Sequence, residues 1–294
     1  MKRIASVAFL TFITSLAPTG GTSANQDGTI YWYGGDFPPY SIVAGPKQGQ
    51  GIADQRKDLL VEYLPEFRHE TIHATTARIL QEIKIKPNAC NVAYLKTPER
   101  EAIMEFSATP IQWILPNGII TSRNRLPVLK RFINDRGELK LDAFLNTGQY
   151  RLGIIAGRSF GTGIDAVLKK YKDKNLLVTV PSRDHSASRL LKLLNQSEYE
   201  AIVGYAIELN YIIRELGLNA SDFVFLPVAE EPSLIPTYVV CSKSDVGKHV
   251  IATVNRAITD TKTKQRVETS YRTWLAGENL ALYDRLQQQL HNER

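Results

Sequence analysis

Arg100 is the residue whose type and position point most directly to ligand chemistry. It follows Thr97 and Pro98, and threonine is a good N-cap while proline is a good first helical residue, so Arg100 falls at the third position of a helix. That end of a helix carries partial positive charge, and an arginine there costs roughly 0.3–1 kcal/mol. A bound anion would make this electrostatic energy favourable, because a guanidinium and free backbone N–H groups together bind a carboxylate or phosphate. The segment alone leaves two interpretations open, an anion site and a solvated surface arginine.

A second chemical motif is the stretch Gly157-Arg158-Ser159-Phe160-Gly161, which matches the glycine-x-serine-x-glycine nucleophile elbow of serine hydrolases. A triad would need a downstream acid and histidine. His249 and His291 follow in suitable order, whereas His185 lies too close to Ser159. Because His249 falls in a predicted helix and His291 in the C-terminal tail, and because no oxyanion sequence such as His-Gly-Gly is present, we expect that the protein is not a hydrolase.

The start of the chain is typical of an exported protein. Met1-Lys2-Arg3 precedes an apolar run from Ile4 to Ala17, and small residues ending at Ala24 suit cleavage before Asn25. We expect residues 1–24 to be a signal peptide. The apolar run is shorter than the roughly 20 residues needed to cross a bilayer, and no cysteine lies near the cleavage site to accept a lipid. The predicted compartment is therefore the periplasm, without a lipid anchor.

The charge of the chain argues against a nucleic-acid partner. Loss of the two basic residues in the signal peptide, Lys2 and Arg3, lowers the formal net charge from +6 to +4. The remaining lysines and arginines are interleaved with acidic residues, as in segment 169–174, and no block of like charge would follow a nucleic-acid backbone. At this length the chain forms one large domain or two of ordinary size.

The chain has two cysteines, Cys90 and Cys241. In an oxidising compartment such a pair favours a disulfide, which would close a loop of about 150 residues and stabilise the fold by roughly 4–5 kcal/mol. Two buried free thiols are the alternative. No histidine or acid lies at ligand spacing from either cysteine, and His69 and His73 alternate on a predicted strand without further ligands. We therefore expect no metal, and we expect no cofactor.

The elements that would position Arg100 alternate between strands and helices. From residue 28 the apolar pattern predicts strands at 31–33, 67–73 and 91–95 and helices at 52–64 and 76–83. This order is typical of an α/β fold with largely parallel sheets, in which ligands bind at the carboxyl ends of the strands. Phe37 and Arg100 both follow such ends.

A second unit of the same architecture follows a charged segment, residues 122–146, that we expect to be loop-like. Its predicted strands and helices cover 152–156, 165–171, 176–180, 186–194, 201–203, 207–216 and 223–226. Beyond it the pattern predicts a strand at 237–241, helices at 245–258 and 265–275, and a helical tail at 280–290. Two such units indicate two lobes with a cleft between them, and periodicity leaves open which lobe the tail contacts.

Four segments resemble the periplasmic solute-binding proteins of ABC transporters, in the polar amino-acid-binding class known as bacterial extracellular solute-binding protein family 3. The strongest is Thr97-Pro98-Glu99-Arg100 with Phe106-Ser107 and Pro110. The others are Asp36–Tyr40, Leu152–Gly161 and Glu200–Gly204, and the resemblance covers nearly the whole mature chain. It implies the two-lobed α/β fold of type 2 periplasmic binding proteins, the Venus flytrap fold, in which each lobe is a mostly parallel sheet flanked by helices.

The resemblance also implies how the chain is divided. The first lobe would be discontinuous, comprising residues 25–121 and 231–294, and the second lobe would comprise residues 122–230. Two hinge crossings would lie near 117–123 and 230–236. Cys90 and Cys241 both fall in the first lobe of this scheme, which favours a disulfide between them.

A ligand site follows from the same resemblance. In the family, the residue matching Arg100 pairs with a ligand carboxylate, aromatic side chains matching Phe37 pack against the ligand, and the loop matching Gly157–Ser159 supplies donors from the second lobe. We predict that Ser159 closes onto the ligand and that Tyr205 offers a neutral hydrogen bond. The complete predicted set is Arg100, Thr97, Phe37, Tyr40, Ser159, Tyr205 and Trp32.

Two positions depart from the amino-acid-binding pattern. The family usually has an aspartate for the ligand ammonium shortly after the strand at 201–203, but this chain has Tyr205 there, and a neutral phenol cannot balance a full positive charge. Leu95 stands where a polar residue often precedes the capping threonine. We therefore expect a carboxylate, or another small anion with an apolar or aromatic body, in place of an ordinary α-amino acid.

Two alternatives keep the same fold. A few relatives are dehydratases of cyclic carboxylic acids, which need a general acid or base in the cleft. Glu99, Asp36 and Glu200 are the nearest acids, and each has an ordinary structural role, so we predict a non-enzyme without catalytic residues. We predict a monomer that binds a small molecule and delivers it to an ABC transporter permease, with a ligand-sensing membrane receptor as the alternative partner.

Overall fold

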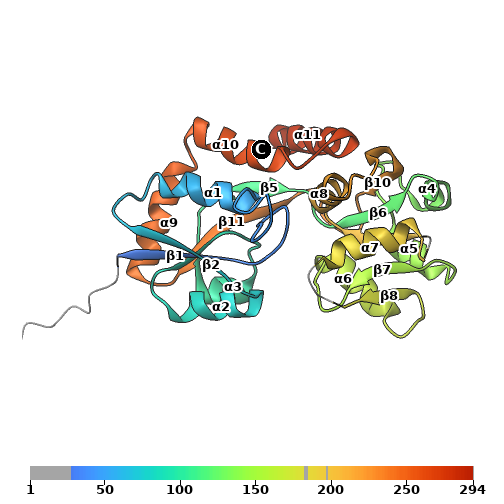
Figure 1. Cartoon of the computed structure of the whole chain (residues 1–294), viewed down its shortest axis with the longest axis horizontal. Helices are drawn as coiled ribbons and strands as arrows, with labels where there is room; N and C mark the ends of the chain where they lie inside the picture. The colour runs from blue at the N-terminus through green and yellow to red at the C-terminus, as the bar shows by residue number, and fades with distance from the viewer. Residues whose placement is uncertain (1–27, 182–184, 197, 294) are drawn as a thin grey trace, which may run out of the picture.

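The computed structural model of the chain describes residues 28–181, 185–196 and 198–293, which form two α/β lobes side by side (Figure 1). The predicted signal peptide lies outside the described residues. Within them, no helix is both long enough and apolar enough to cross a bilayer.

The sheet of the first lobe is built around two parallel pairs, β1 with β2 and β1 with β3. The chain returns to this sheet through β11, which runs antiparallel to three neighbours. The strand order is β2 (Arg68–His73), β1 (Thr29–Gly34), β3 (Ala89–Tyr94), β11 (Ile235–Ser242) and β4 (Met104–Phe106), with β5 (Gln112–Ile114) also paired to β11.

The sheet of the second lobe has a parallel centre and an antiparallel side. Strand β7 runs parallel to β8 and β9, whereas β6 runs antiparallel to β9 and β10. The order is β10 (Phe223–Leu226), β6 (Gly118–Ser122), β9 (Ala201–Gly204), β7 (Leu152–Ile155) and β8 (Leu177–Val180). Both sheets are therefore mixed, whereas the sequence predicted mostly parallel sheets. The difference arises at β6 and β11, which follow the two crossings of the chain between the lobes.

The first crossing lies at residues 115–117, because β5 belongs to the first sheet and β6 to the second. The predicted end of the first lobe, residue 121, lies inside β6. The return crossing lies between β10 and β11, at residues 227–234, and overlaps the predicted segment 230–236.

Helices flank both sheets, and most begin where the sequence predicts. Segment 122–146 is not the loop that we expected, since it contains two short helices, α4 and α5, and a 3-10 turn at Lys130–Phe132. The helices are α1 (Ile52–Val61), α2 (Thr76–Ile85), α3 (Pro98–Ile103), α4 (Leu126–Leu129), α5 (Leu141–Asn146), α6 (Thr162–Tyr171), α7 (Ser186–Asn195), α8 (Ala206–Leu216), α9 (Asp245–Ala257), α10 (Thr261–Arg272) and α11 (Gly277–Asn292), with a further 3-10 turn at Ala220–Asp222.

A disulfide joins Cys90 and Cys241, as the sequence predicted. The two residues face each other on the neighbouring strands β3 and β11, with their Cα atoms 4.0 Å apart. Both are fully buried in the apolar core of the first lobe. The bond therefore ties the returning strand to the strand that precedes the Arg100 helix.

The C-terminal helices run along one edge of the molecule, from the first lobe toward α8 of the second (Figure 1). Tyr271, Trp274 and Tyr283 belong to the same apolar cluster as the core of the second lobe. Arg214 of α8 donates to the carbonyl of Thr273 at 3.0 Å. The tail that we had assigned to the first lobe therefore contacts both lobes.

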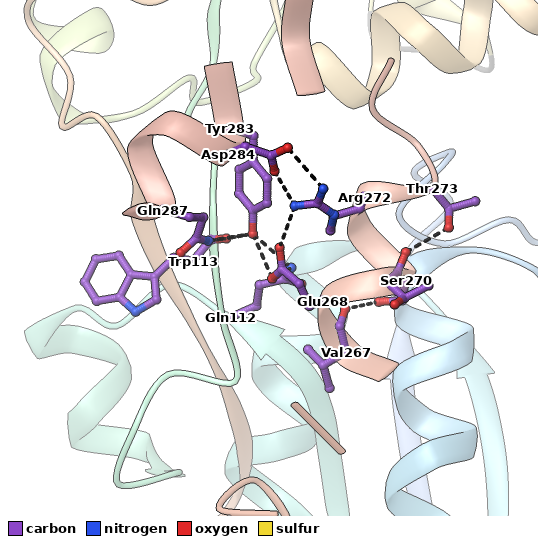
Figure 2. Close-up of polar contacts among 11 residues, drawn as sticks. Gln112, Trp113, Val267, Glu268, Ser270, Arg272, Thr273, Tyr283, Asp284 and Gln287 are labelled. Carbon is purple, nitrogen blue, oxygen red and sulfur yellow. Dashed lines mark hydrogen bonds and ion pairs between the residues drawn. The ribbon is translucent and has the colours of Figure 1, made fainter. Parts of the chain in front are cut away.

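A partly buried polar network, shown in Figure 2, joins β5, the strand directly before the first crossing, to these helices. We call Gln112, Trp113, Glu268, Tyr283 and Gln287 the hinge network. The Tyr283 hydroxyl lies 2.9 Å from the Trp113 carbonyl and 3.0 Å from the Glu268 carboxyl, and Gln112 and Gln287 donate to it at 3.2 and 2.6 Å. Arg272, which is paired with Asp284, lies 3.8 Å from Glu268.

Candidate functional site

The loops that follow β1, β7 and β9 bring side chains of both lobes together. Phe37 follows β1 of the first lobe, and Arg158 and Tyr205 follow β7 and β9 of the second. The rings of Phe37 and Tyr205 meet edge to face with their centroids 5.9 Å apart, and the guanidinium carbon of Arg158 lies 5.0 Å from the Phe37 ring centre. We call Phe37, Tyr40, Asn117, Arg158, Phe160, Tyr205 and Glu208 the inter-lobe cluster. It lies at the carboxyl ends of parallel strands, the usual place for ligands in α/β sheets.

A tight turn after β1 fixes the first-lobe side of the cluster. The backbone of Phe37 exchanges hydrogen bonds of 3.0 and 2.9 Å with Ser41. The turn places the Tyr40 ring 6.5 Å from that of Phe37. The hydroxyl of Tyr40 accepts a long 3.4 Å hydrogen bond from Arg56 of α1, a fully buried arginine. Burial raises the pKa of Tyr40, and Arg56 offsets part of this effect.

On the second lobe, Arg158 and Glu208 form a bidentate ion pair. The two Arg158–Glu208 contacts measure 2.8 and 2.6 Å, and the side chains are 16% and 5% exposed. Burial lowers the pKa of Arg158, but the Glu208 carboxylate outweighs burial, so the net shift is upward. Glu208 also accepts from the backbone N–H of Tyr205 at 3.1 Å, and Arg158 donates to Asn117 at 3.4 Å. The ion pair is therefore held by further hydrogen bonds at both ends, and through Asn117 it contacts the first crossing.

Arg100 lies at the helix start that the sequence predicted. Thr97 caps α3 by accepting from the backbone N–H of Arg100 at 3.3 Å, and Pro98 is the first helical residue. The guanidinium donates to the Leu95 carbonyl at 2.7 Å and lies 4.7 Å from the ring centre of Tyr94. Burial raises the pKa of Tyr94, with Arg100 lowering it and Tyr40 adding to the rise. Tyr94 thus lies against the guanidinium of Arg100 at the carboxyl end of β3, the strand next to β1.

Of the predicted site residues, Phe37, Tyr40 and Tyr205 come together, and Arg100 and Thr97 lie at the neighbouring strand end. Ser159 is exposed and donates to Asp165 at 2.5 Å, so its hydroxyl is engaged at the start of α6. Trp32 does not reach the cluster. It is 2% exposed within the first-lobe core, where its indole N–H donates to His69 at 3.0 Å.

The side chains considered for catalysis have structural partners elsewhere. His249 bonds Glu66 at 2.9 Å on the first lobe, away from Ser159. Glu200 pairs with Arg125 at 3.0 Å and also accepts from the backbone N–H of Arg151. Hydrogen bonding to its own backbone N–H is the first cause of a lowered pKa at Glu99. Among the described residues, no three His, Cys, Asp or Glu side chains are arranged to hold a metal ion.

The sequence analysis missed three residues of this region: Arg158, Glu208 and Arg56. One local signal was available for Glu208, which stands three residues after Tyr205, at the helix position where a glutamate commonly bonds back to the capping residue. Arg158 lies within the glycine-serine motif at 157–161, where the motif itself specifies the serine and leaves the residue before it open. Arg56 gave no signal, because its burial depends on how α1 packs against the rest of the fold.

Comparison with known proteins shows the fold. No family model matches the chain, and no curated protein matches it. Among solved structures, a histidine kinase sensor domain with similarity to periplasmic binding proteins is 15% identical, with a TM-score of 0.58 over 85% of this chain and 97% of that one. An amino acid ABC transporter substrate-binding protein from Streptococcus pneumoniae, bound to L-arginine, is 14% identical, with a TM-score of 0.58 over 85% and 94%.

A third similar structure is an ancestral amino-acid-binding protein described as a precursor of cyclohexadienyl dehydratase. It is 17% identical, with a TM-score of 0.57 over 85% of this chain and 96% of that one. The chain therefore has the two-lobed α/β fold of periplasmic binding proteins, the fold that the sequence predicted.

Proposed function

We propose that the protein binds a small carboxylate-bearing solute between its two lobes and that Arg100 pairs with the carboxylate. The observation that carries the proposal is the placement of Arg100 after the carboxyl end of β3, with its guanidinium over the ring of Tyr94. Strand β3 neighbours β1, whose carboxyl end leads to Phe37 of the inter-lobe cluster. Its bond to the Leu95 carbonyl uses one of the five N–H donors of a guanidinium. The remaining fork suits a planar carboxylate.

The charges around the cluster support an anion over an amino acid. Arg56 and Arg158 lie over the rings of Tyr40 and Phe37 in the same way that Arg100 lies over Tyr94. The acid nearest Tyr205 is Glu208, and both of its oxygens are bound by Arg158. A ligand ammonium would therefore meet positive charge and an already neutralised carboxylate. Phe37 and Tyr40 supply an apolar wall, which suits a ligand with an aromatic or cyclic body.

We infer that binding takes place in the periplasm and serves delivery to an ABC transporter, with lobe closure as a population shift driven by contacts made only in the closed state. The similar structures include both a transporter-associated binding protein and a kinase sensor domain, so a membrane receptor is the second candidate partner. Pull-down from membranes with and without ligand distinguishes a permease from a receptor.

The acidic side chains considered for catalysis have structural roles, and this favours a protein that binds its ligand without converting it. Glu99, Glu200 and Asp36 are respectively a helix-start residue, an ion-pair partner and an exposed turn residue. The likeness to a dehydratase precursor makes catalysis worth a direct check. A bound cyclic acid recovered unchanged after long incubation supports a binding protein, whereas a dehydrated product would overturn this part of the proposal.

The central test starts with a thermal-shift screen of small acids, amino acids and short peptides, because a bound ligand raises the melting temperature by mass action. Benzoate and other cyclic monocarboxylates are expected among the hits, and neutral benzamide and cationic benzylamine are not. For a hit, Arg100→Ala is expected to weaken binding by roughly 1.5–3 kcal/mol, which is about 10- to 150-fold in Kd.

Lys96→Ala is the matched control for this test. It removes one positive charge from the same loop, but the lysine is already paired with Glu101 at 2.8 Å. Its Kd should stay within about threefold of the wild type, since exposed ion pairs contribute little. Equal affinity of Arg100→Ala and the wild type for an identified carboxylate would show that the assignment of Arg100 is wrong.

A further inference from the structure

The guanidinium of Arg158 is surrounded in the way that a protein surrounds a bound cation. Its central carbon lies 5.0, 5.5 and 5.5 Å from the ring centres of Phe37, Phe160 and Tyr205. Phe37 comes from the first lobe, whereas Phe160 and Tyr205 come from the second. Rings at these distances attract a cation through their negative faces, so both lobes close on the same positive charge.

The carboxylate of Glu208 completes this site. It is 5% exposed, it lies in the first turn of α8, and each of its oxygens accepts from a different Arg158 nitrogen. A desolvated carboxylate and aromatic rings around the same position are the chemistry that recognises a free guanidinium or ammonium. The structure thus contains a cation site whose occupant is part of the chain.

We propose that Arg158 is a built-in ligand of this site and that it determines specificity by excluding free cations from the inter-lobe cluster. Removal of its side chain uncovers a receptor for small guanidinium compounds, made of Glu208 and the rings of Phe37, Phe160 and Tyr205.

An ordinary structural ion pair accounts for these observations less well. A buried ion pair by itself is weak evidence for stability, because desolvation offsets much of the attraction. Arg158 and Glu208 could pair within the second lobe without a partner from the first, yet Phe37 covers the guanidinium from across the interface. The ion pairs Lys47–Glu215 and Arg123–Glu278, which join the second lobe to residues outside it, have side chains that are more than one-third exposed. Arg158 is therefore the charge that the two lobes enclose together.

The test measures the melting temperature of the Arg158→Ala variant in the presence of millimolar methylguanidinium. Methylguanidinium should raise the melting temperature of this variant in a saturable way, by roughly 2–4 °C. It should have no saturable effect on the wild type, in which the site is filled. Methylurea has nearly the same shape without the charge, and it should have no effect on either protein.

The matched control is the double variant Arg158→Ala/Glu208→Gln, which keeps the cavity and removes the carboxylate. A methylguanidinium response equal to that of Arg158→Ala, or an equal response of the wild type, overturns the proposal. If Arg158→Ala does not fold alone, its refolding yield with and without methylguanidinium replaces the melting temperature. Recovery only with the cation supports the built-in ligand, and no recovery under conditions where the double variant folds overturns it.

This experiment is independent of the carboxylate proposal, because its probe carries no carboxylate and Arg100 is unchanged throughout. If Arg158→Ala does not bind methylguanidinium, the cation-site proposal fails and the carboxylate proposal is unaffected. If Arg100→Ala binds a carboxylate as tightly as the wild type, the carboxylate proposal fails and the cation-site proposal is unaffected.

Discussion

Two polar regions near the junction of the lobes differ in the kind of interaction they use. The hinge network joins β5, directly before the first crossing, to α10 and α11 through hydrogen bonds centred on the Tyr283 hydroxyl, which lies in a fully buried side chain. The inter-lobe cluster joins the strand-end loops through an enclosed charge and ring faces, with Arg158 at its centre.

The difference matters for motion between the lobes. Hydrogen bonds such as those of Tyr283 need fixed distances and angles, so the hinge network suits a part of the molecule that keeps its geometry. The contact of Phe37 with Arg158 and Tyr205 is less directional, and the Arg158–Glu208 pair stays within the second lobe when Phe37 moves away. We infer that the cluster can open and close while the hinge network holds the crossing in place.

The largest effect is expected from removal of the charge that balances Arg158. Glu208→Gln leaves a largely buried guanidinium with a neutral partner, and the free energy of unfolding should fall by about 3 kcal/mol. Chemical denaturation measures the change. Glu215→Gln is the control, since it makes the same substitution on the same helix at the exposed pair with Lys47 and should cost less than about 1 kcal/mol. Equal losses in the two variants would mean that the cluster does not depend on an enclosed charge.

An intermediate effect is expected at the hinge network. Tyr283→Phe removes one of two hydrogen-bond partners from the Gln112 amide and from the Trp113 carbonyl, which keep Glu268 and Gln287. Loss of the buried hydroxyl should cost about 1–3 kcal/mol. Tyr63→Phe removes a hydroxyl that bonds Thr263 at 2.6 Å from a partly exposed ring, and its cost should stay below about 1 kcal/mol. A Tyr283→Phe variant as stable as the wild type would remove the distinction between a fixed hinge and a movable cluster.

The smallest effect concerns pH and Glu268 of the hinge network. Burial raises the pKa of the Glu268 carboxyl above its usual 4.5, with Tyr283 and Gln112 offsetting part of the rise. The folded state then holds the proton more tightly than the unfolded chain, so the contribution of Glu268 is fully present below about pH 4.5 and is lost as the pH rises through the raised pKa. Glu268→Gln should therefore gain stability relative to the wild type as the pH rises from about 4.5 through the raised pKa. The gain should be small, because the Glu268 side chain is 36% exposed and solvent screens its charge.

Glu62→Gln provides the opposite sign in the same pH series. A hydrogen bond from Arg266 lowers the pKa of Glu62, so the wild-type carboxylate contributes stability above its ordinary pKa, and this is lost as the pH falls. That variant should lose stability relative to the wild type as the pH rises. Parallel slopes for the two variants would contradict the assignment of a buried, proton-retaining carboxyl to the hinge.

Local features of the fold were predictable because they depend on neighbouring residues. The Thr97 cap and Pro98 start of α3, and the end of α8 at Gly217, follow from side-chain and backbone preferences within one helical turn. Segment 122–146 was misjudged because its helices are short and their apolar residues become buried only against the second lobe, as Leu141 and Phe144 show.

The candidate site was predictable only in part. The strand-end positions of Phe37, Tyr205 and Arg100 follow from the alternation of strands and helices. Trp32 was misplaced because its large apolar ring suits a core as well as a ligand wall, and the sequence has no way to tell which face of β1 meets helices. The place of Arg158 in the site was not predictable, because it depends on an ion pair with Glu208, which is 50 residues away in the chain.

The sequence by itself determined most strands and helices outside residues 104–146, most helix starts and the presence of two cysteines able to pair, because these depend on short-range preferences and residue identity. Only the tertiary structure decided which distant groups meet: Cys90 with Cys241 across a separation of 151 residues, Tyr283 with Trp113 of β5, and Phe37 with Arg158. The physical reason is that a charge or a polar atom acquires its role from its burial and partners, and both are set by the packing of segments that are far apart in the chain.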